Sequence, residues 1–286
     1  MKALFEKKVF NDTTHISAKK YKNLQNLPHW HMEYELVFVL EGSAELMVNN
    51  SFFKITKGSC AFIGSEEVHN IKSMPESILG IIKTDTQNVK RIVGNKHLTS
   101  PVLNYNTTQI HIFYDILSEL KNQKDFYNII ADAIITKFIA EIFRVEPITS
   151  YTECAKKMTT KYKELLEMLA ANYSHITFEK AAEYVGLNKS YFSRYFYRFS
   201  GITFTHYLNI LKVSAAIEKM QEKKLNMTEI SIYSGFGTIR NFNRVFKEIT
   251  GYTPKKLPDN YVLLSNQKDI SELDFNPTLN CTEILE

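Results

Sequence analysis

The chain has 286 residues, of which 44% are hydrophobic and 13% aromatic, and its formal net charge is +4. This length and apolar content exclude a small disulfide-stapled domain and a disordered chain, and they predict two globular domains. The apolar runs are far shorter than the roughly 18 residues of a membrane span, and three widely spaced cysteines are typical of reduced thiols, so we expect a cytoplasmic protein that does not enter a membrane.

Short strand-like runs, separated by turn signals, make up the first hundred residues. Four of them lie at residues 35–40, 44–48, 52–55 and 59–63. Pairs such as Glu41-Gly42 and Asn49-Asn50 interrupt these runs. Because short strands with regular breaks are typical of antiparallel barrels and jelly rolls, we expect such a barrel over residues 1–105, with an arm or a loose terminus at its start.

Histidines and a carboxylate gather at the start of this predicted barrel. His29, His31 and Glu35 have the same parity, so on a strand they point to one face, which in a closed barrel is the interior. With Gly42 they keep every spacing of the first cupin motif, His-x-His-x3-Glu-x6-Gly, which this stretch resembles. His69 stands in a stretch that resembles a degraded second cupin motif. The sequence therefore predicts a cupin-like barrel with these four side chains converging inside it.

Two kinds of site are compatible with these four side chains. Three imidazoles and a carboxylate are a donor set for Fe, Mn, Ni or Zn with open positions, which would indicate a metal-dependent cupin enzyme such as a dioxygenase or an isomerase. In the alternative, neutral histidines and the glutamate form hydrogen bonds with one another or with a polar ligand in a metal-free pocket. The residues by themselves leave both interpretations open.

The hydrophobic period changes to that of helices after the predicted barrel. Apolar residues recur at steps of three and four through residues 108–121 and at steps of four through residues 126–145. The first of these stripes consists of Ile110, Phe113, Leu117 and Leu120. Such a stripe either packs on its own barrel or pairs two protomers. We expect a two-helix element over 106–147 and an interdomain linker over 148–160.

A basic excess is confined to the segment after this linker. Residues 160–258 contain 15 Lys and Arg against 8 Asp and Glu, whereas residues 259–286 contain 1 against 6. A local excess of positive charge favours a polyanionic partner, because neutralised phosphates release counterions. The acidic end of the chain is most simply interpreted as a solvated tail.

Residues 177–201 have the residue types of a helix-turn-helix motif in the required order. Thr177 and Asn188 can cap two successive helices, and Gly186 permits the tight turn between them. The second helix has an apolar face that contains Phe192, Phe196 and Phe199. Its opposite face has short polar and basic side chains, which suit a helix that lies in a major groove.

A second copy of this pattern covers residues 228–254. Its core face consists of Phe242, Val245, Phe246 and Ile249. Between the two copies, the stretch from Thr203 to Gln221 is predicted to be one helix, about 27 Å long. A helix of that length can separate two DNA-reading helices by about one turn of duplex, which is about 34 Å.

The two linked motifs resemble the AraC/XylS family of transcription regulators over roughly residues 160–257. The most specific matches are Gly235-Phe236, Phe242, Arg244, Phe246-Lys247, Gly251 and Thr253-Pro254. The resemblance implies an all-α domain over 161–258 that reads two successive major-groove segments. It implies base contacts from Ser190, Ser193, Arg194, Arg240, Asn241 and Arg244. Arginine is suited to guanine and asparagine to adenine.

The resemblance also implies a role for the N-terminal half. In regulators of this family a cupin-like barrel senses an effector, often with no known metal, and the two helices after it pair protomers. We therefore predict a regulator with no catalytic residue, metal or cofactor, whose effector pocket contains His29, His31, Glu35 and His69. The expected partners are duplex DNA, a second copy of the chain, a polar effector such as a sugar or another metabolite, and RNA polymerase. The metal-dependent enzyme and a DNA binder without a ligand are the competing interpretations.

Overall fold

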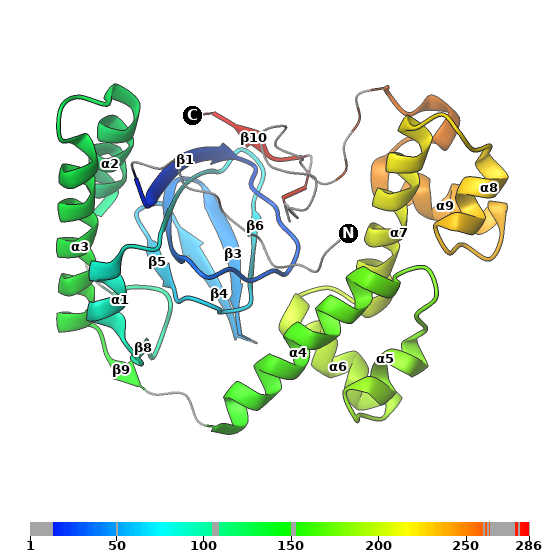
Figure 1. Ribbon diagram of the computed structural model, residues 1–286, viewed down its shortest axis with the longest axis horizontal. Helices are drawn as coiled ribbons and strands as arrows, with labels where there is room; N and C mark the ends of the chain where they lie inside the picture. The colour runs from blue at the N-terminus through cyan, green and yellow to red at the C-terminus, as the bar shows by residue number, and fades with distance from the viewer. Residues whose placement is uncertain are drawn as a thin grey trace.

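A β-barrel lies between two helical parts of the molecule (Figure 1). The computed structural model describes residues 14–49, 51–104, 109–149, 153–259, 261, 263, 278–279 and 281–285, without the side chains of 153–159. The predicted N-terminal arm falls largely on residues 1–13, which lie outside these ranges. Among the described helices, none has both the length and the apolar character needed to cross a membrane.

Two antiparallel sheets form the barrel, with the strand orders β10-β1-β7-β2-β5 and β4-β3-β6. The strands are β1 (Ile16–Lys22), β2 (Tyr34–Glu41), β3 (Ser43–Val48), β4 (Ser51–Thr56), β5 (Cys60–Ile63), β6 (His69–Ser73), β7 (Ile78–Thr84) and β10 (Glu283–Ile284). The four predicted strands are confirmed to within one residue at each end, and they are β2 to β5. The predicted fold class, a cupin-like barrel with helices followed by an all-α domain, is confirmed.

Strand β2 is buried on both faces, which explains its continuous apolar run. Val37 and Val39 pack between the two sheets in the barrel core. Leu36, Phe38 and Leu40 point to the opposite face, where they pack against helices. Because successive side chains of a strand point to opposite faces, a strand covered on both sides loses the usual alternation of apolar and polar residues.

Helices cover the outer face of the first sheet (Figure 1). They are α1 (Gln87–Val93), α2 (Ile110–Asn122) and α3 (Tyr127–Val145). Phe113 of α2 is fully buried, and its ring centroid lies 5.9 Å from that of Phe38. Gly80 of β7 permits this approach, because a Cβ there would lie 2.7 Å from the Phe113 ring. The predicted stripe of α2 therefore packs on its own barrel, whereas Phe126 and Ile129 remain exposed next to it.

The segment between the two halves contains more regular structure than the sequence indicated. Strands β8 (His97–Leu98) and β9 (Ile148–Thr149) pair with each other, and helix α4 (Glu153–Asn172) begins inside the range 148–160 predicted as the linker. The helices that follow are α5 (Phe178–Tyr184), α6 (Lys189–Ser200), α7 (Phe204–Gln221), α8 (Met227–Tyr233) and α9 (Ile239–Thr250). A 3-10 turn at Pro254–Lys256 ends this bundle. Leu27 and Val68 of the barrel pack into the core of the bundle, so the two halves share a buried contact.

The described part of the acidic tail returns to the barrel. Strand β10 pairs antiparallel with β1, where Tyr21 lies opposite Ile284 and Lys22 opposite Glu283 (Figure 1). Leu279 donates its N–H to the carbonyl of Gln25 at 2.8 Å. Both residues of β10 are exposed, as expected of a solvated tail, but they also pair with β1, because this edge strand offers main-chain groups that a further strand can satisfy.

Candidate functional site

The first helix-turn-helix motif presents its predicted reading face to solvent. Asn188 and Thr177 cap α6 and α5 as expected, since their side chains accept the N–H groups of Tyr191 and Lys180. Gly186, in the turn, has a φ of 73°. The three predicted contact residues of α6 are all exposed, namely Ser190, Ser193 and Arg194. Opposite them, the phenylalanines of α6 are buried in the bundle core, which fixes the orientation of the reading face.

Arg194 is held by a neighbour on its own helix. Its guanidinium carbon lies 4.7 Å from the centroid of the Tyr191 ring, one turn before it. Tyr191 is itself exposed. A guanidinium over an aromatic face keeps its five N–H donors available in the plane of the group, so the pair presents a preoriented donor fork to solvent.

The second motif repeats this arrangement on α9. Thr238 caps the helix, and Phe242 and Phe246 are fully buried. The predicted contact residues Arg240, Asn241 and Arg244 are all exposed. Arg244 donates to Asn241 Oδ1 at 3.1 Å and to Glu248 Oε2 at 2.9 Å. The guanidinium is therefore held between an amide and a carboxylate, on the face that points away from the core.

Helix α7 connects the two motifs and is fixed to the second one. Its observed range confirms the single helix expected between them (Figure 1). Lys212 of α7 donates to the carbonyl of Gly235, in the turn between α8 and α9, at 2.7 Å. Half-burial of this ammonium lowers its pKa from the ordinary value. The contact joins the connecting helix to the turn that positions α9.

The four predicted pocket residues lie together, but the backbone arrangement that brings them together was not indicated by the sequence. His29, His31 and Glu35 do not share one strand, since only Glu35 lies on β2, so their common parity does not explain why they meet. His29 forms an antiparallel bridge with His69, with N–H to carbonyl distances of 3.0 and 2.9 Å. The chain then bends at residues 32–33 and enters the other sheet at β2. The change of sheet, and not the parity of one strand, brings the imidazoles and the carboxylate together.

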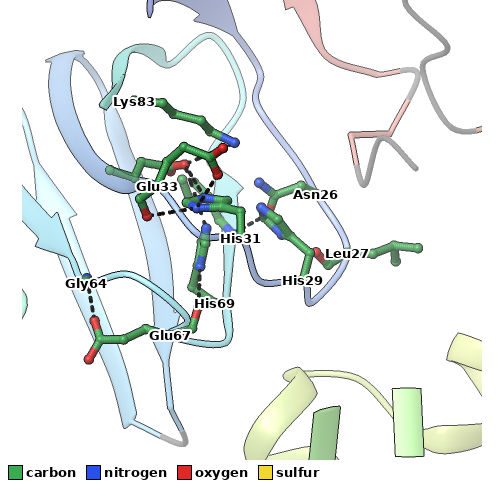
Figure 2. Close-up of polar contacts among 11 residues, drawn as sticks. Asn26, Leu27, His29, His31, Glu33, Gly64, Glu67, His69 and Lys83 are labelled. Atoms are coloured by element: carbon green, nitrogen blue, oxygen red, sulfur yellow. Dashed lines mark hydrogen bonds and ion pairs between the residues drawn. The ribbon is translucent and has the colours of Figure 1, made fainter. Parts of the chain in front are cut away.

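All four side chains are buried, and main-chain carbonyls fix the three rings. The ring centroids lie 4.2 Å apart for His29 and His69, 4.9 Å for His31 and His69, and 5.7 Å for His29 and His31. His31 Nε2 lies 3.0 Å from Oε2 of Glu35. Figure 2 shows the rings turned toward one another below the side chain of Lys83. They form a packed polar cluster.

Lys83 belongs to this cluster, although sequence reasoning missed it. Its ammonium lies 3.3 Å from Glu35 Oε2. Burial opposes ionisation of Glu35, but the positive charge of Lys83 and the polar contacts with His31 and His69 hold the pKa of this carboxyl well below its usual range. Burial, together with repulsion from Lys83, lowers the pKa of His31 to about 3. The sequence signal that could have indicated Lys83 is its position as a lysine in the largely apolar strand β7.

A cavity of about 450 Å³ lies apart from this cluster, between the barrel and α4. Its lining includes Tyr34, Phe62, Glu66, Lys96 and Lys163. The predicted pocket residues are not among the described residues that line it. The structure therefore has a cavity at the boundary of the two halves and, separate from its lining, a packed polar cluster inside the barrel.

Comparison with known proteins identifies both halves. Residues 18–139 match the model of the AraC-like ligand binding domain, and residues 181–259 match a helix-turn-helix domain model. A Staphylococcus aureus protein named as an uncharacterized HTH-type transcriptional regulator is 20% identical over 255 residues, which are 84% of this chain and 33% of that protein. The chain thus spans about a third of the length of the first curated relatives that it matches.

Two further similarities extend over most of the chain. The HTH-type transcriptional activator RhaR of Salmonella arizonae is 23% identical over 277 residues, which are 88% of this chain and 92% of that protein. The crystal structure of ToxT from Vibrio cholerae matches with a TM-score of 0.37 at 16% identity and covers 84% of this chain and 95% of that one.

Proposed function

We propose that this chain, a transcriptional regulator of the AraC/XylS family, reads DNA through α6 and α9 and responds to a small molecule bound in its barrel. Its AraC-like ligand-binding domain precedes its helix-turn-helix domain. The observation that carries the proposal is the repeated build of the two motifs. Each has a capped second helix, a buried aromatic back and an exposed face with arginine. Such a face suits the edges of bases in a major groove.

The proposed base contacts are the exposed polar side chains of the two reading helices. They are Ser190, Ser193, Arg194, Arg240, Asn241 and Arg244. Because α7 has 18 residues, the two helices are separated by about 27 Å along its axis. This is close to one turn of duplex, so the two motifs would enter successive major-groove segments on one side of the DNA.

The proposed effector site is the buried cluster of His29, His31, Glu35 and His69. Its support is the concentration of polar atoms within an otherwise apolar barrel, where unsatisfied groups are costly. A polar metabolite is the class of effector proposed from this chemistry. The family is one of regulators, so we propose no enzymatic activity and no catalytic residue.

We further propose a homodimer that pairs through α2 and α3. Large apolar side chains remain exposed on these helices and at the N-cap of α3, namely Tyr114, Phe126, Ile129 and Ile130. They lie beside the stripe that packs on the barrel, so the same two helices have a second apolar face available. The boundaries proposed for the functional parts are 1–105, 106–147, 148–160, 161–258 and 259–286. We also propose that the protein acts in the cytoplasm and contacts RNA polymerase.

Titration of the full chain against DNA from upstream of its own gene tests the DNA-binding proposal. Affinity should fall steeply as salt concentration rises, because each Lys or Arg contact with phosphate releases counterions. Arg194→Ala and Arg244→Ala should each weaken binding by about 1–3 kcal/mol. Arg91→Ala, which removes an exposed arginine of the barrel half, is the matched control. A salt-independent affinity, or equal effects of all three variants, would contradict the proposal.

A further inference from the structure

The three histidine rings of the cluster are held in the same way by the main chain. The Nδ1 atoms of His29 and His69 lie 2.8 Å from the carbonyl oxygens of Leu27 and Glu67, and the Nδ1 of His31 lies 3.1 Å from that of Glu33 (Figure 2). A carbonyl oxygen only accepts, so these contacts place the ring proton on Nδ1. In a neutral ring the other nitrogen, Nε2, then carries a lone pair. This is how metal-binding histidines are commonly oriented.

The three rings bring one donor atom each to a common point. These atoms lie within 4.8 Å of one another, and the rings are 0% to 1% exposed. The described residues give the buried Nε2 of His69 no hydrogen bond. Its closest carboxylate oxygen, Oε2 of Glu35, lies 3.8 Å away. An uncompensated polar atom in such a position indicates that a partner is missing.

His31 also has a polar atom whose hydrogen bonding is not satisfied. A neutral imidazole has one N–H group, yet His31 has an acceptor at both nitrogens, the Glu33 carbonyl at 3.1 Å and Glu35 Oε2 at 3.0 Å. It can donate to only one of them, so at the other side two lone pairs face each other. A cation beside Nε2 and the Glu35 carboxylate removes this conflict, because both atoms then donate to it. Lys83 supplies positive charge to the carboxylate from 3.3 Å.

We propose that His29, His31 and His69 bind one divalent transition-metal ion, with the Glu35 carboxylate beside it, and that this ion, rather than a polar metabolite, is the effector that the barrel binds at this cluster. Neutral imidazoles with a carboxylate are a donor set for zinc, nickel, iron or manganese. The inference rests on the proposed function only in treating the barrel as the sensor. The inference differs from the prediction made from the sequence, which was a pocket without a metal.

The site is connected directly to the DNA-binding half. Leu27 accepts the hydrogen bond of His29 through its carbonyl and packs its side chain into the core of the helical bundle. Val68, next to His69 in sequence, is fully buried in the same core. A shift of either ring on metal binding therefore moves a residue that the bundle packs against. This contiguous contact is the physical basis on which the ion would change DNA affinity.

The test uses the full chain, stripped of metal with a chelator and then titrated with Co²⁺ and with Zn²⁺. We expect one equivalent of metal per chain and visible ligand-field absorption bands from bound Co²⁺ that Zn²⁺ abolishes. His31→Gln and His69→Gln should each weaken metal binding by at least about 100-fold. Loss of a group that only hydrogen-bonds to a metal ligand costs up to about this factor, and loss of a ligand should cost no less. His175→Gln, which changes an exposed histidine of the helical bundle, should bind as the unmodified chain does.

The unmodified chain decides the result even if the cluster variants fail to fold. The metal site would be overturned if the unmodified chain showed no Co²⁺ bands and retained no Zn²⁺. Undiminished metal binding by folded His31→Gln and His69→Gln proteins would also overturn it. DNA affinity is then measured with Zn²⁺ and with chelator. Metal that binds at the cluster without changing DNA affinity would overturn the effector role. A chain that takes up metal but binds its upstream DNA under neither condition would instead contradict the proposed regulator function.

Discussion

The ammonium group of Lys163 lies 4.3 Å from the centroid of the Trp30 ring and 3.0 Å from Oε2 of Glu66. Lys163 belongs to α4, at the start of the helical half, whereas Trp30 stands between two histidines of the buried cluster. In the sequence, Trp30 has the parity opposite to that of His29 and His31. The structure adds that its ring packs against the other half of the molecule.

Replacement of Lys163 by methionine should loosen the contact between the halves. The loss of a cation over an aromatic ring and of an ion pair with a half-exposed carboxylate should cost about 1 kcal/mol. Trp30 is the sole tryptophan of the chain, so tryptophan fluorescence reports on the surroundings of this one ring. We expect a shifted emission spectrum and a lower unfolding midpoint. Lys180→Met, at an exposed position of α5, is the control, and an identical response of the two variants would count against the contact.

Two glycines with nearly equal backbone angles should respond differently to alanine. Gly186 and Gly235 have φ values of 73° and 77°. A Cβ on Gly186 would meet nothing within 4 Å, so Gly186→Ala should cost about 1–2 kcal/mol from the left-handed backbone alone. A Cβ on Gly235 would lie 2.4 Å from the carbonyl oxygen of Ser174, so Gly235→Ala should cost on the order of 3 kcal/mol or more. Thermal unfolding compares them, and equal costs would contradict the clash.

Arg244 and Lys247 should affect DNA binding in different ways. Arg244→Ala should lower affinity for the cognate site and relax the preference at one base pair, because a bidentate donor to one base is lost. Lys247→Ala should weaken binding to all sequences alike and reduce the salt slope by about 1, as expected for a phosphate contact. Binding to a library of single-base variants measures both. Equal losses on specific and nonspecific DNA for Arg244→Ala would identify this residue as a phosphate contact.

Truncation after residue 277 should expose the edge of the barrel. It removes β10 and with it the hydrogen bond from Leu285 N–H to the carbonyl of Lys20, at 2.8 Å. The amides of β1 should then exchange faster with solvent, while those of α3 stay unchanged. Hydrogen exchange followed by mass spectrometry measures both. Thr282→Val removes only the hydroxyl that accepts from Gln25 N–H and should have a smaller effect. Unchanged exchange in β1 would show that the pairing does not form.

A charge at the exposed start of α3 should dissociate the proposed dimer. Phe126 and Ile129 are 70% and 61% exposed. Phe126→Asp and Ile129→Asp should convert a dimer to a monomer in sedimentation experiments, because a carboxylate buried in an apolar interface is costly. Ile232→Asp is matched to them, since Ile232 is 69% exposed on α8. Dissociation by Ile232→Asp alone would move the interface to the helical half.

The local features of this protein were predictable from its sequence. Strands β2 to β5, helices α2, α3 and α7, the two helix-turn-helix motifs and the caps at Thr177 and Asn188 follow from interactions between residues that are near neighbours in the chain. The buried aromatic faces of α6 and α9 follow from helical periodicity in the same way. Two copies of one local pattern therefore sufficed to predict the pair of reading helices.

The tertiary structure alone decided how distant segments meet. The pairing of β10 with β1 joins Tyr21 to Ile284 across nearly the whole chain, and no residue pattern indicates it. The contact of Lys83 with Glu35 depends on the register of two neighbouring strands. The orientation of the histidine rings depends on main-chain carbonyls that a bend places beside them. Such contacts depend on the path of the backbone in space, whereas hydrophobic period and turn residues report only on near neighbours.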